Sequence, residues 1–318
     1  MLPKNTVVAV LQEFGLRLVD RKELSLGTAN FNEMVETDKG PFVLRQWLCS
    51  GDENILFECS ILQHLHAKGF PVPKPIKTAD GKEFALLYGK HFGLFEFLGG
   101  RKVGQCSLNR EQLRALGRTL AEMQLALKSC NPRGKSFLKD SFDFSFDYSV
   151  LRNDFPKISP AFGEAKLELG QKVKMLEPEL KKFGDCTNIG PIHNDFSCWN
   201  FKFTGNKISA ILDFGDACIG SWAADLAVLL SDQALHPHKT DFKSIKEIFS
   251  AYSGIVTLSE SEKRALPLLM LHRAVRIALF FANSAAINPA KEEKYLSFFK
   301  KSVQKARQFE KTMLQISF

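Results

Sequence analysis

The feature that most constrains this 318-residue chain is a set of polar residues held at fixed spacing around one expected hairpin. His193 is followed two residues later by Asp195, and Asn200 comes five residues after that aspartate. The segment 201–212 has two apolar runs joined by a Thr-Gly-Asn-Lys turn, and Asp213 begins the sequence Asp-Phe-Gly directly after it. Because a hairpin folds back on itself, we expect it to bring Asp213 close to Asn200.

These residue types at this spacing suit the transfer of a phosphoryl group to a hydroxyl group. A carboxylate such as Asp195 can accept, or orient, the proton of an attacking hydroxyl. The amide oxygen of Asn200 and the carboxylate of Asp213 are hard oxygen ligands, of which Mg²⁺ usually takes one or two from the protein beside phosphates. The order matches the kinase pattern of H-x-D, four residues, N, then D-F-G. We therefore predict Asp195 as the catalytic base and Asn200 and Asp213 as metal ligands.

Composition argues against several other classes of protein. Hydrophobic residues make up 45% of the chain, which is enough for a real core and excludes wholesale disorder. The formal charge of +8 suits an anionic partner such as a nucleotide, but it is spread out, so nucleic-acid binding is supported by charge alone and is not expected. The seven cysteines are odd in number and form no CxxC pair, which argues for reduced, cytosolic thiols and against a zinc site.

Membrane association is not expected either. The N-terminus acquires polar residues after a short apolar run, which is typical of an amphipathic helix rather than a signal peptide. The most apolar late stretch, 266–286, contains His272, Arg273 and Arg276, so we interpret it as a buried helix. These patterns favour a cytoplasmic location, and they leave the oligomeric state open.

The chain changes character near residue 100. Before it, turn signals separate short apolar runs, whereas helical patterns dominate after it. We expect an α+β fold, with an antiparallel sheet and one main helix in the N-terminal part and a larger, mostly helical C-terminal part. The expected elements are helices at 5–15, 54–68 and 111–128, strands at 24–26, 31–36, 42–47 and 92–98, and a hairpin of 76–78 with 84–88.

The catalytic segment resembles the aminoglycoside phosphotransferase and choline kinase superfamily, whose loop has the pattern H-G-D, four residues, N. The D-L-A helix of that superfamily is matched here by 225–227. The segments 26–30, 42–45 and 69–73 are similar to the bacterial homoserine-kinase-like branch. The resemblance covers about residues 20–290. It implies a two-lobed, protein-kinase-like fold, ATP or GTP, Mg²⁺ and a small hydroxylated substrate.

The resemblance also implies a division of labour along the chain. It places a nucleotide-binding lobe at 1–93, a hinge at 94–100, and a catalytic and substrate-binding lobe at 101–318. The implied nucleotide-binding residues are Gly27, Thr28, Arg45, Glu58, Glu96, Phe97 and Leu98.

Several of these roles have plainer alternatives. Arg45 takes a strand position that the family usually fills with Lys, and its expected partner is Glu58; the alternatives are a solvated strand residue and a helix-surface charge. Gly27 and Thr28 would cover the phosphates through backbone N–H groups and a hydroxyl, or would form an ordinary hairpin turn. The hinge residues 96–98 would contact the base of the nucleotide through their backbone.

His193 and Asp225 are implied as structural supports of the catalytic loop. His193 would hold the loop from the core, and Asp225 would bond to the loop backbone, with capping of the following helix as the alternative. Asn194 stands where the family usually has Gly, a departure that matters only if the position needs a positive φ. The segment 197–199, Ser-Cys-Trp, replaces the commoner His-Pro pair.

The phosphate acceptor stays open between aminoglycosides, homoserine-like amino alcohols and related metabolites. Asp195, Asp216 and Asp232 are candidate contacts for a cationic substrate, and turn capping is the alternative for the last two. A protein kinase would need a long peptide-docking loop, but only nine residues separate Gly215 from Asp225. A non-enzymatic nucleotide-binding scaffold would be expected to lose the base or a metal ligand, and neither is lost.

Overall fold

The computed structural model describes residues 2–24, 30–48, 50–104, 107–139, 143–152, 160–183 and 188–318. The chain forms two compact units, each assembled from three separate segments. The first unit contains Met1–Lys102, Ala126–Phe137 and Asn200–Ala217, and the second contains Val103–Leu125, Leu138–Trp199 and Cys218–Phe318. The chain therefore passes between the units five times, and one of these crossings, from Trp199 to Asn200, separates the predicted base from the predicted metal ligands in the sequence.

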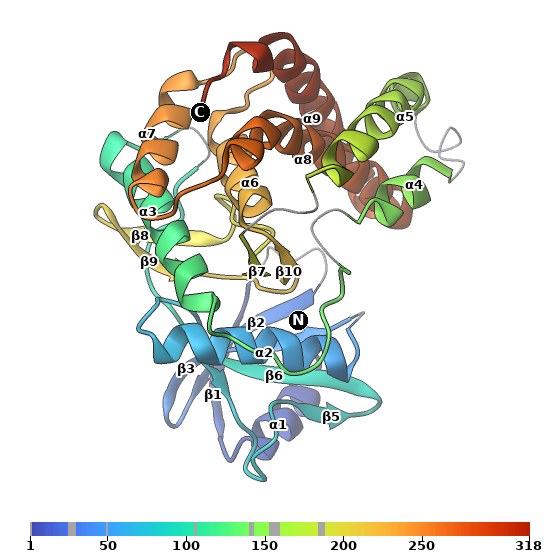
Figure 1. The fold of residues 1–318 in the computed structure, drawn as a ribbon. Helices are drawn as coiled ribbons and strands as arrows, with labels where there is room; N and C mark the ends of the chain where they lie inside the picture. The colour runs from blue at the N-terminus through green and yellow to red at the C-terminus, as the bar shows by residue number, and fades with distance from the viewer. Residues whose placement is uncertain are drawn as a thin grey trace. The chain divides into compact units, whose positions relative to one another are not determined.

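The first unit is built on an antiparallel sheet of six strands, with β6 paired to β3 on one edge and to both β4 and β5 on the other (Figure 1). Strands β1, β2 and β3 form an antiparallel meander, in which β2 and β3 take the places of the strands predicted at 31–36 and 42–47. A separate hairpin, β8 with β9, belongs to the same unit and is the predicted hairpin after Asn200. The strands are β1 (Leu18–Glu23), β2 (Asn30–Thr37), β3 (Gly40–Trp47), β4 (Pro75–Ile76), β5 (Ala85–Leu87), β6 (Lys90–Glu96), β8 (Phe201–Thr204) and β9 (Lys207–Ile211).

Two helices pack on this sheet. Helix α1 (Lys4–Glu13) contributes an apolar face to a core shared with the sheet, and helix α2 (Asp52–Ala67) buries residues at the spacing of an amphipathic helix. Gly69, with φ of 82°, ends α2 in the left-handed conformation that glycine adopts without a Cβ penalty. The shared core is made of Val7, Val10, Leu11, Val35, Leu44, Phe92 and their neighbours.

Two strand predictions for this unit differ from the structure. Strand β1 at Leu18–Glu23 was not predicted; of the strand predicted at 24–26 only Leu24 is described, and it is not in a strand, while Ser25 and Leu26 lie outside the described residues. β1 is an edge strand with largely exposed side chains, so it lacks the apolar alternation of a buried strand. The segments 76–78 and 84–88 do not pair with each other: β4 and β5 lie end to end along β6, and the tight turn at Thr78–Lys82 only interrupts that edge.

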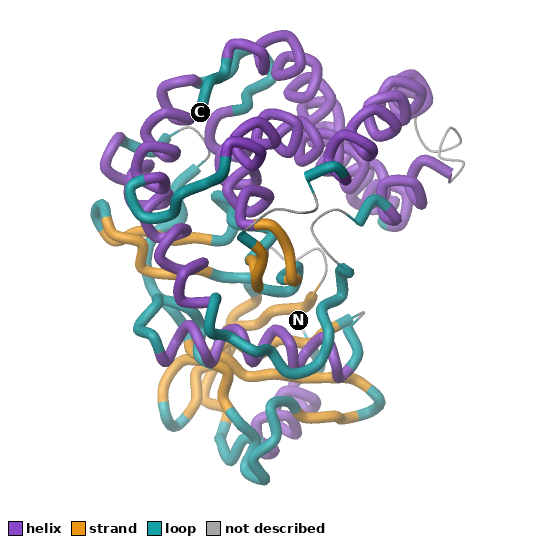
Figure 2. The backbone as a smooth tube through the Cα atoms, viewed as in Figure 1, coloured by secondary structure: helices purple, strands orange, loops and turns teal. Residues whose placement is uncertain are grey.

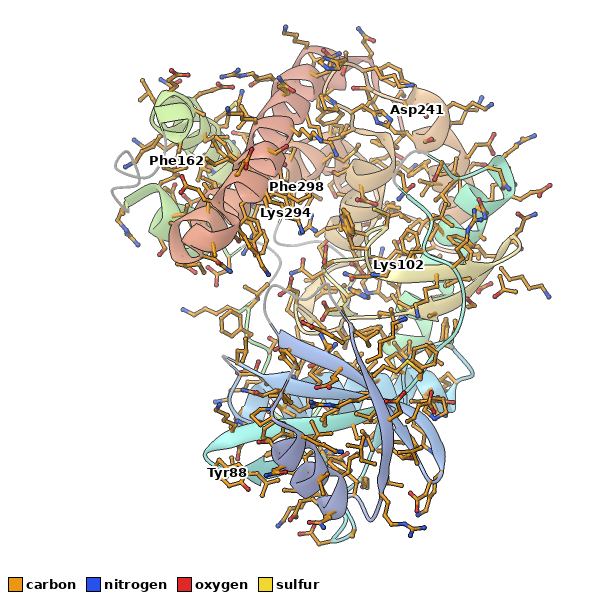
Figure 3. All side chains as sticks on the ribbon, turned by 180° about the vertical axis from the view of Figure 1, so that it is seen from behind. Tyr88, Lys102, Phe162, Asp241, Lys294 and Phe298 are labelled. Carbon is orange, nitrogen blue, oxygen red and sulfur yellow. The ribbon has the colours of Figure 1, made fainter. Side chains whose placement is uncertain are left out.

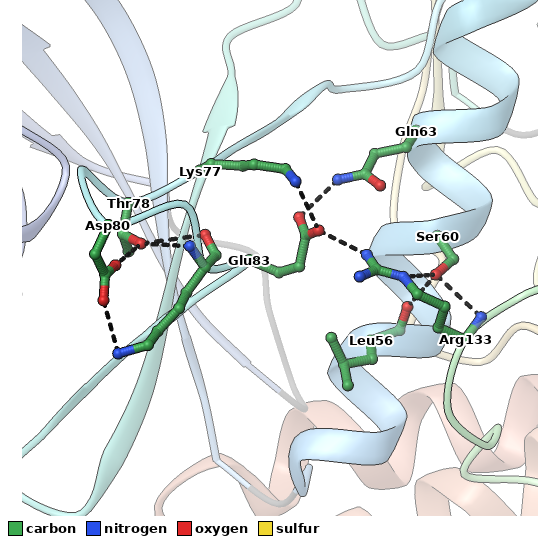
Figure 4. A network of polar contacts seen from close by, with 9 residues as sticks. Leu56, Ser60, Gln63, Lys77, Thr78, Asp80, Glu83 and Arg133 are labelled. Carbon is green, nitrogen blue, oxygen red and sulfur yellow. Dashed lines mark hydrogen bonds and ion pairs between the residues drawn. The ribbon is translucent and has the colours of Figure 1, made fainter.

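A strap of chain, Ala126–Phe137, belongs to the first unit although it follows helix α3 in the sequence. Figure 4 shows its main attachment. Arg133 donates from Nη2 to Glu83 Oε1 at 2.6 Å, and its backbone N–H donates to Ser60 Oγ on α2 at 3.1 Å. The strap therefore ties α2 to the segment between β4 and β5.

The second unit is mostly helical, as predicted (Figure 2). Its short sheet pairs β7 with β10, and α8 packs against α4, α5, α6 and α9. Helix α3 (Arg110–Leu127) begins in this unit and ends in the strap. The remaining elements are α4 (Ser145–Arg152), α5 (Pro160–Lys181), β7 (Ile189–Ile192), β10 (Cys218–Ser221), α6 (Trp222–Ala234), α7 (Phe242–Ser253), α8 (Glu260–Ile287), η2 (Pro289–Lys291), α9 (Glu292–Thr312) and η3 (Met313–Gln315).

Helix α8 is the predicted buried helix of this unit. In the described part of the chain it is the single helix long and apolar enough to cross a membrane, but 61% of its most apolar window is buried inside the protein. Aromatic packing joins α8 to α9: the rings of Phe281 of α8 and Phe298 of α9, the latter labelled in Figure 3, are stacked with their centroids 4.9 Å apart. Ser259 and Glu262 form a capping box at its N-terminus.

Candidate active site

The loop that carries Asp195, the predicted base, belongs to the second unit and is bonded to Asp225 on α6. The carboxylate of Asp225 is fully buried and accepts hydrogen bonds from the backbone N–H groups of His193 at 3.1 Å and Asn194 at 2.8 Å. His193 is also fully buried, and its Nδ1 accepts a hydrogen bond from the backbone N–H of Asp195 at 3.2 Å. Both residues bond to the loop backbone, which is the geometry expected of structural supports, and Asp225 does not serve as the cap of α6.

The charge on Asp225 is costly in this position. Burial raises the pKa of Asp225, while the nearby His193 ring and the two backbone N–H groups act to lower it.

The backbone conformation of Asn194 shows why asparagine can replace the glycine that the family usually has at this position. Its φ is 62°, in the left-handed region, so the position does need a positive φ, and Asn is one of the few non-glycine residues that enter this region readily.

Asp195 lies in the same loop and bonds to a partner that the local sequence does not suggest. Nη2 of Arg273, from the middle of α8, donates to Asp195 Oδ1. The side chain of Arg273 is only 18% exposed, and that of Asp195 is 26% exposed. The signal that could have found this pair is the charge itself, because an arginine inside an apolar, buried helix needs a partner.

The two other candidate substrate aspartates lie in different surroundings. Asp232 on α6 turns toward the loop, where its Oδ2 accepts hydrogen bonds from the backbone N–H of Cys198 at 2.7 Å and from Gln233 Nε2 at 2.6 Å. Burial raises the pKa of Asp232. Asp216 is exposed and belongs to the first unit. Contact of either aspartate with a substrate stays a prediction.

Arg45 stands at the centre of a charged cluster in the first unit. Its Nη1 lies 2.6 Å from Glu58 Oε1 on α2, so the predicted pairing of these two residues is present. Its Nε donates to Asn32 Oδ1 on β2 at 3.0 Å, and its Nη2 lies 3.8 Å from Asp213 Oδ1. One guanidinium thus connects the sheet, α2 and the Asp-Phe-Gly segment.

Two aromatic side chains, those of Trp47 and Phe95, contact this cluster. Trp47 Nε1 donates to the second carboxylate oxygen of Glu58 at 3.1 Å, and the guanidinium of Arg45 lies over the ring of Phe95 at 5.3 Å. Burial raises the pKa of Glu58, against the opposing attraction of Arg45. Burial alone would lower the pKa of Arg45, but attraction to Glu58 and Asp213 outweighs it and raises that pKa.

The hairpin of β8 and β9 brings the backbone of Asn200 next to Leu212, the residue that precedes Asp213. The backbone N–H of Leu212 donates to the carbonyl of Asn200 at 2.7 Å, and Asp213 follows Leu212 directly. The Asp213 side chain is 53% exposed, and its φ of 66° turns the backbone sharply at this point. No group of three His, Cys, Asp or Glu side chains suited to a metal ion exists among the described residues. One carboxylate and one amide fit Mg²⁺ that arrives with a nucleotide, because Mg²⁺ takes few protein ligands beside phosphates.

The other predicted nucleotide contacts are placed only in part. Gly27 and Thr28 lie outside the described residues. Glu96 ends β6, and the carbonyl of Leu98 accepts a hydrogen bond from Lys202 Nζ at 2.7 Å. The same ammonium group lies 5.1 Å from the centre of the Phe97 ring. Lys202 thus contacts the hinge segment, where the family resemblance implies that the base of the nucleotide binds.

The chain is similar to known proteins along most of its length. A model of the phosphotransferase enzyme family matches residues 20–257. A homoserine kinase of Bradyrhizobium diazoefficiens is 31% identical over 270 residues, which cover 82% of this chain and 78% of that protein. A homoserine kinase of Granulibacter bethesdensis is 26% identical over 284 residues, which cover 86% of this chain and 84% of that protein.

Solved structures share the fold. A microcompartment-associated aminopropanol kinase has a TM-score of 0.77 at 18% identity, with 98% of both chains covered. The amicoumacin kinase hAmiN has a TM-score of 0.73 at 18% identity, with 96% of this chain and 94% of that chain covered. The kinase-like fold predicted from the catalytic segment is thereby confirmed.

Proposed function

This chain belongs to the phosphotransferase enzyme family, in its homoserine-kinase-like branch, and we propose that it transfers the γ-phosphate of ATP to the hydroxyl group of L-homoserine. It is a small-molecule kinase that acts on an alcohol group; the particular acceptor and donor are the proposal. The observation that carries the acceptor is the similarity, over more than four-fifths of the chain, to homoserine kinases of several bacteria.

The first unit supplies the groups suited to phosphate. Arg45 is positioned by Glu58 and Asn32, so its charge is fixed before any ligand binds, and its planar fork can bridge two phosphate oxygens. Asn200 and Asp213 would hold Mg²⁺, which neutralises charge on the phosphates when bound. The lobe at 1–93 and the hinge at 94–100 are the proposed nucleotide-binding parts, and 101–318 is the proposed catalytic and acceptor-binding part.

The second unit supplies the proposed base. The hydroxyl oxygen of the acceptor attacks the γ-phosphorus, the bond from that phosphorus to the bridging oxygen breaks, and ADP leaves. The proton of the hydroxyl passes to Asp195. Asp225 and His193 keep the backbone around Asp195 in one conformation, which lowers the entropy that would otherwise be lost on reaching the reactive geometry. A cytoplasmic location, where ATP and amino-acid metabolites are both present, is part of the same proposal.

The test is an acceptor panel with the purified protein, Mg²⁺ and either ATP or GTP. L-homoserine, 3-aminopropanol, choline and kanamycin are compared by steady-state kinetics, and the product is identified by phosphorus NMR and mass spectrometry. We expect phosphorylated homoserine and the highest kcat/KM for this acceptor. Asp195→Asn should lower kcat by about 10²–10⁴-fold while nucleotide still binds. A preference for choline or kanamycin would contradict the proposed acceptor, and an active Asp195→Asn variant would contradict the proposed base.

A further inference from the structure

We propose that Arg273 is a specificity-determining residue that binds the carboxylate of the acceptor. The inference rests on the proposed function, because it takes Asp195 as the base and a hydroxy amino acid as the substrate. It adds a chemical reason for the choice of acceptor, since it separates a substrate with a carboxylate from amino alcohols and antibiotics without one.

The first observation is the unused bonding capacity of Arg273. A guanidinium carries five N–H donors in a planar fork. In the described part of the chain, the single polar group that contacts this guanidinium is Asp195, through one Nη. The side chain is 82% buried by area, so water can satisfy few of the remaining donors. A carboxylate is the ligand that matches two parallel N–H donors of arginine.

The second observation is that the neighbouring polar side chains of α8 are already committed elsewhere. His272 Nε2 lies 3.3 Å from Asp147 Oδ2 on α4. Arg276 donates from Nη1 to the carbonyl of Asp143 at 3.2 Å. Both therefore hold the segment around α4, and Arg273 is the cation of this helix that faces the proposed base.

The direct contact between Arg273 and Asp195 also limits the size of the ligand. A molecule with its hydroxyl group at Asp195 and its carboxylate at Arg273 must carry the two groups a short carbon chain apart. Homoserine meets this condition. A polycationic aminoglycoside has no carboxylate and would place ammonium groups against the guanidinium, where like charges repel.

The pair also has a consequence for the base. Without an acceptor, Asp195 is neutralised by Arg273. When the acceptor carboxylate binds to the guanidinium, Arg273 contacts both the substrate and the proposed base, which places the acceptor hydroxyl group beside Asp195.

The experiment compares two acceptors that differ only in the carboxylate, L-homoserine and 3-aminopropanol. In wild-type protein, homoserine should have the higher kcat/KM. Arg273→Gln should raise the KM for homoserine by roughly 100-fold, as expected from loss of a charged hydrogen-bond pair, with a smaller effect on kcat. The same variant should lower kcat/KM for 3-aminopropanol by a much smaller factor than for homoserine, since this acceptor loses no bond to Arg273 and is affected only through the lost contact with Asp195. Arg273→Lys should recover part of the homoserine affinity.

Arg276→Gln is the matched control, because it removes the same charge from the same helix at a residue committed to Asp143. It should leave the ratio of the two acceptors unchanged. Equal losses for both acceptors in Arg273→Gln, or the same change of ratio in Arg276→Gln, would overturn the inference while leaving homoserine kinase activity in place. A wild-type protein that does not phosphorylate homoserine would overturn the proposed function and this inference together. If Arg273→Gln does not fold, Arg273→Lys carries the test, with a selective rise in the KM for homoserine expected.

Discussion

The guanidinium of Arg45 meets the carboxylate of Glu58 at 2.6 Å, and the Glu58 side chain is only 5% exposed. The two residues come from β3 and α2, so the ion pair fixes the position of a strand side chain by the position of a helix. A buried pair of this kind adds little net stability but is costly to break, because the remaining charge loses both water and partner. Substitution of either Arg45 or Glu58 should therefore have a measurable effect.

Arg45→Ala should lose far more activity than Arg45→Lys, because the phosphates then lack their cation. We expect Arg45→Lys to lower kcat/KM by roughly tenfold or less, equivalent to about 1.4 kcal/mol. Glu58→Ala should fall between the two, and the double variant with Arg45→Ala should not be additive, since Glu58 acts by orienting Arg45. Glu58→Gln is the control for the hydrogen bond from Trp47. Its amide oxygen can still accept that bond, so the variant removes the charge that pairs with Arg45 and keeps the contact with Trp47. Wild-type activity in Arg45→Ala, or strict additivity, would mean that the first unit does not bind phosphate through this pair.

Asp213→Ala should weaken Mg²⁺-dependent nucleotide binding more than Asn200→Ala does. A carboxylate offers charge as well as geometry to a hard cation, whereas an amide offers geometry alone. The alanine at 200 keeps the backbone carbonyl that accepts from Leu212, so the hairpin should persist in that variant. Nucleotide titrations by calorimetry, with and without Mg²⁺, measure the difference. An unchanged metal dependence in Asp213→Ala would exclude this residue as a ligand.

Asp225→Asn should destabilise the protein by about 1–3 kcal/mol, because an amide cannot accept hydrogen bonds at both of the positions that face backbone N–H groups. The effect should depend on pH. Burial raises the pKa of Asp225, so the folded state binds a proton more tightly than the unfolded state, and the stability from this group is full below its unfolded pKa and decreases as pH rises through its folded pKa. Since asparagine does not titrate, the difference in unfolding free energy between wild type and variant should shrink from about pH 4 toward pH 7.

Asp241→Asn provides a control of opposite sign for this pH experiment. Burial alone would raise the pKa of Asp241, but hydrogen bonds from Ser244 and Lys243 at the start of α7 outweigh it and hold that pKa below its usual value. The stability from Asp241 is therefore present above its unfolded pKa and lost as pH falls through its folded pKa. The difference caused by Asp241→Asn should grow from acid to neutral pH. Urea denaturation at several pH values measures both, and two parallel trends would refute the assignment for Asp225.

Arg133→Ala should lower the unfolding free energy of the first unit by about 1–3 kcal/mol. The buried carboxylate of Glu83 would keep Lys77 and Gln63 but lose its shortest ion pair, shown in Figure 4. Arg133→Lys, which retains the charge, is the control and should cost less. Hydrogen exchange of α2 amides resolves the effect locally. If α2 exchanges at the wild-type rate in Arg133→Ala, the strap does not hold this helix.

The parts of the site that could be predicted are those in which sequence spacing alone determines geometry. The turn between two apolar runs was enough to predict β8 and β9, and the hairpin necessarily brings the start of the Asp-Phe-Gly segment back toward Asn200. The support of the loop by Asp225 and the pairing of Arg45 with Glu58 followed from the family pattern. Their roles in binding and catalysis stay predictions.

What could not be predicted depends on contacts between distant segments. Arg273 and Asp195 lie 78 residues apart in the sequence, and only the packing of α8 beneath the loop brings them together. The contacts of the strap could not be predicted for the same reason, because Arg133 follows a long helix and no sequence pattern indicates that it pairs with Glu83. Strand β1 was not predicted because an exposed edge strand lacks the alternation of apolar and polar residues that identifies a half-buried strand.

The three-segment construction of the first unit has a consequence for biosynthesis. The sheet itself is encoded before residue 102, but its strap and its hairpin arrive with Ala126–Phe137 and Asn200–Ala217. A ribosome must therefore translate about two-thirds of the message before this unit can be completed, and Ser60 and Glu83 lack the partner that Arg133 provides until the strap has been made. We expect nascent chains stalled before residue 200 to be held by chaperones, and a fragment that stops at Lys102 to aggregate rather than to bind nucleotide on its own.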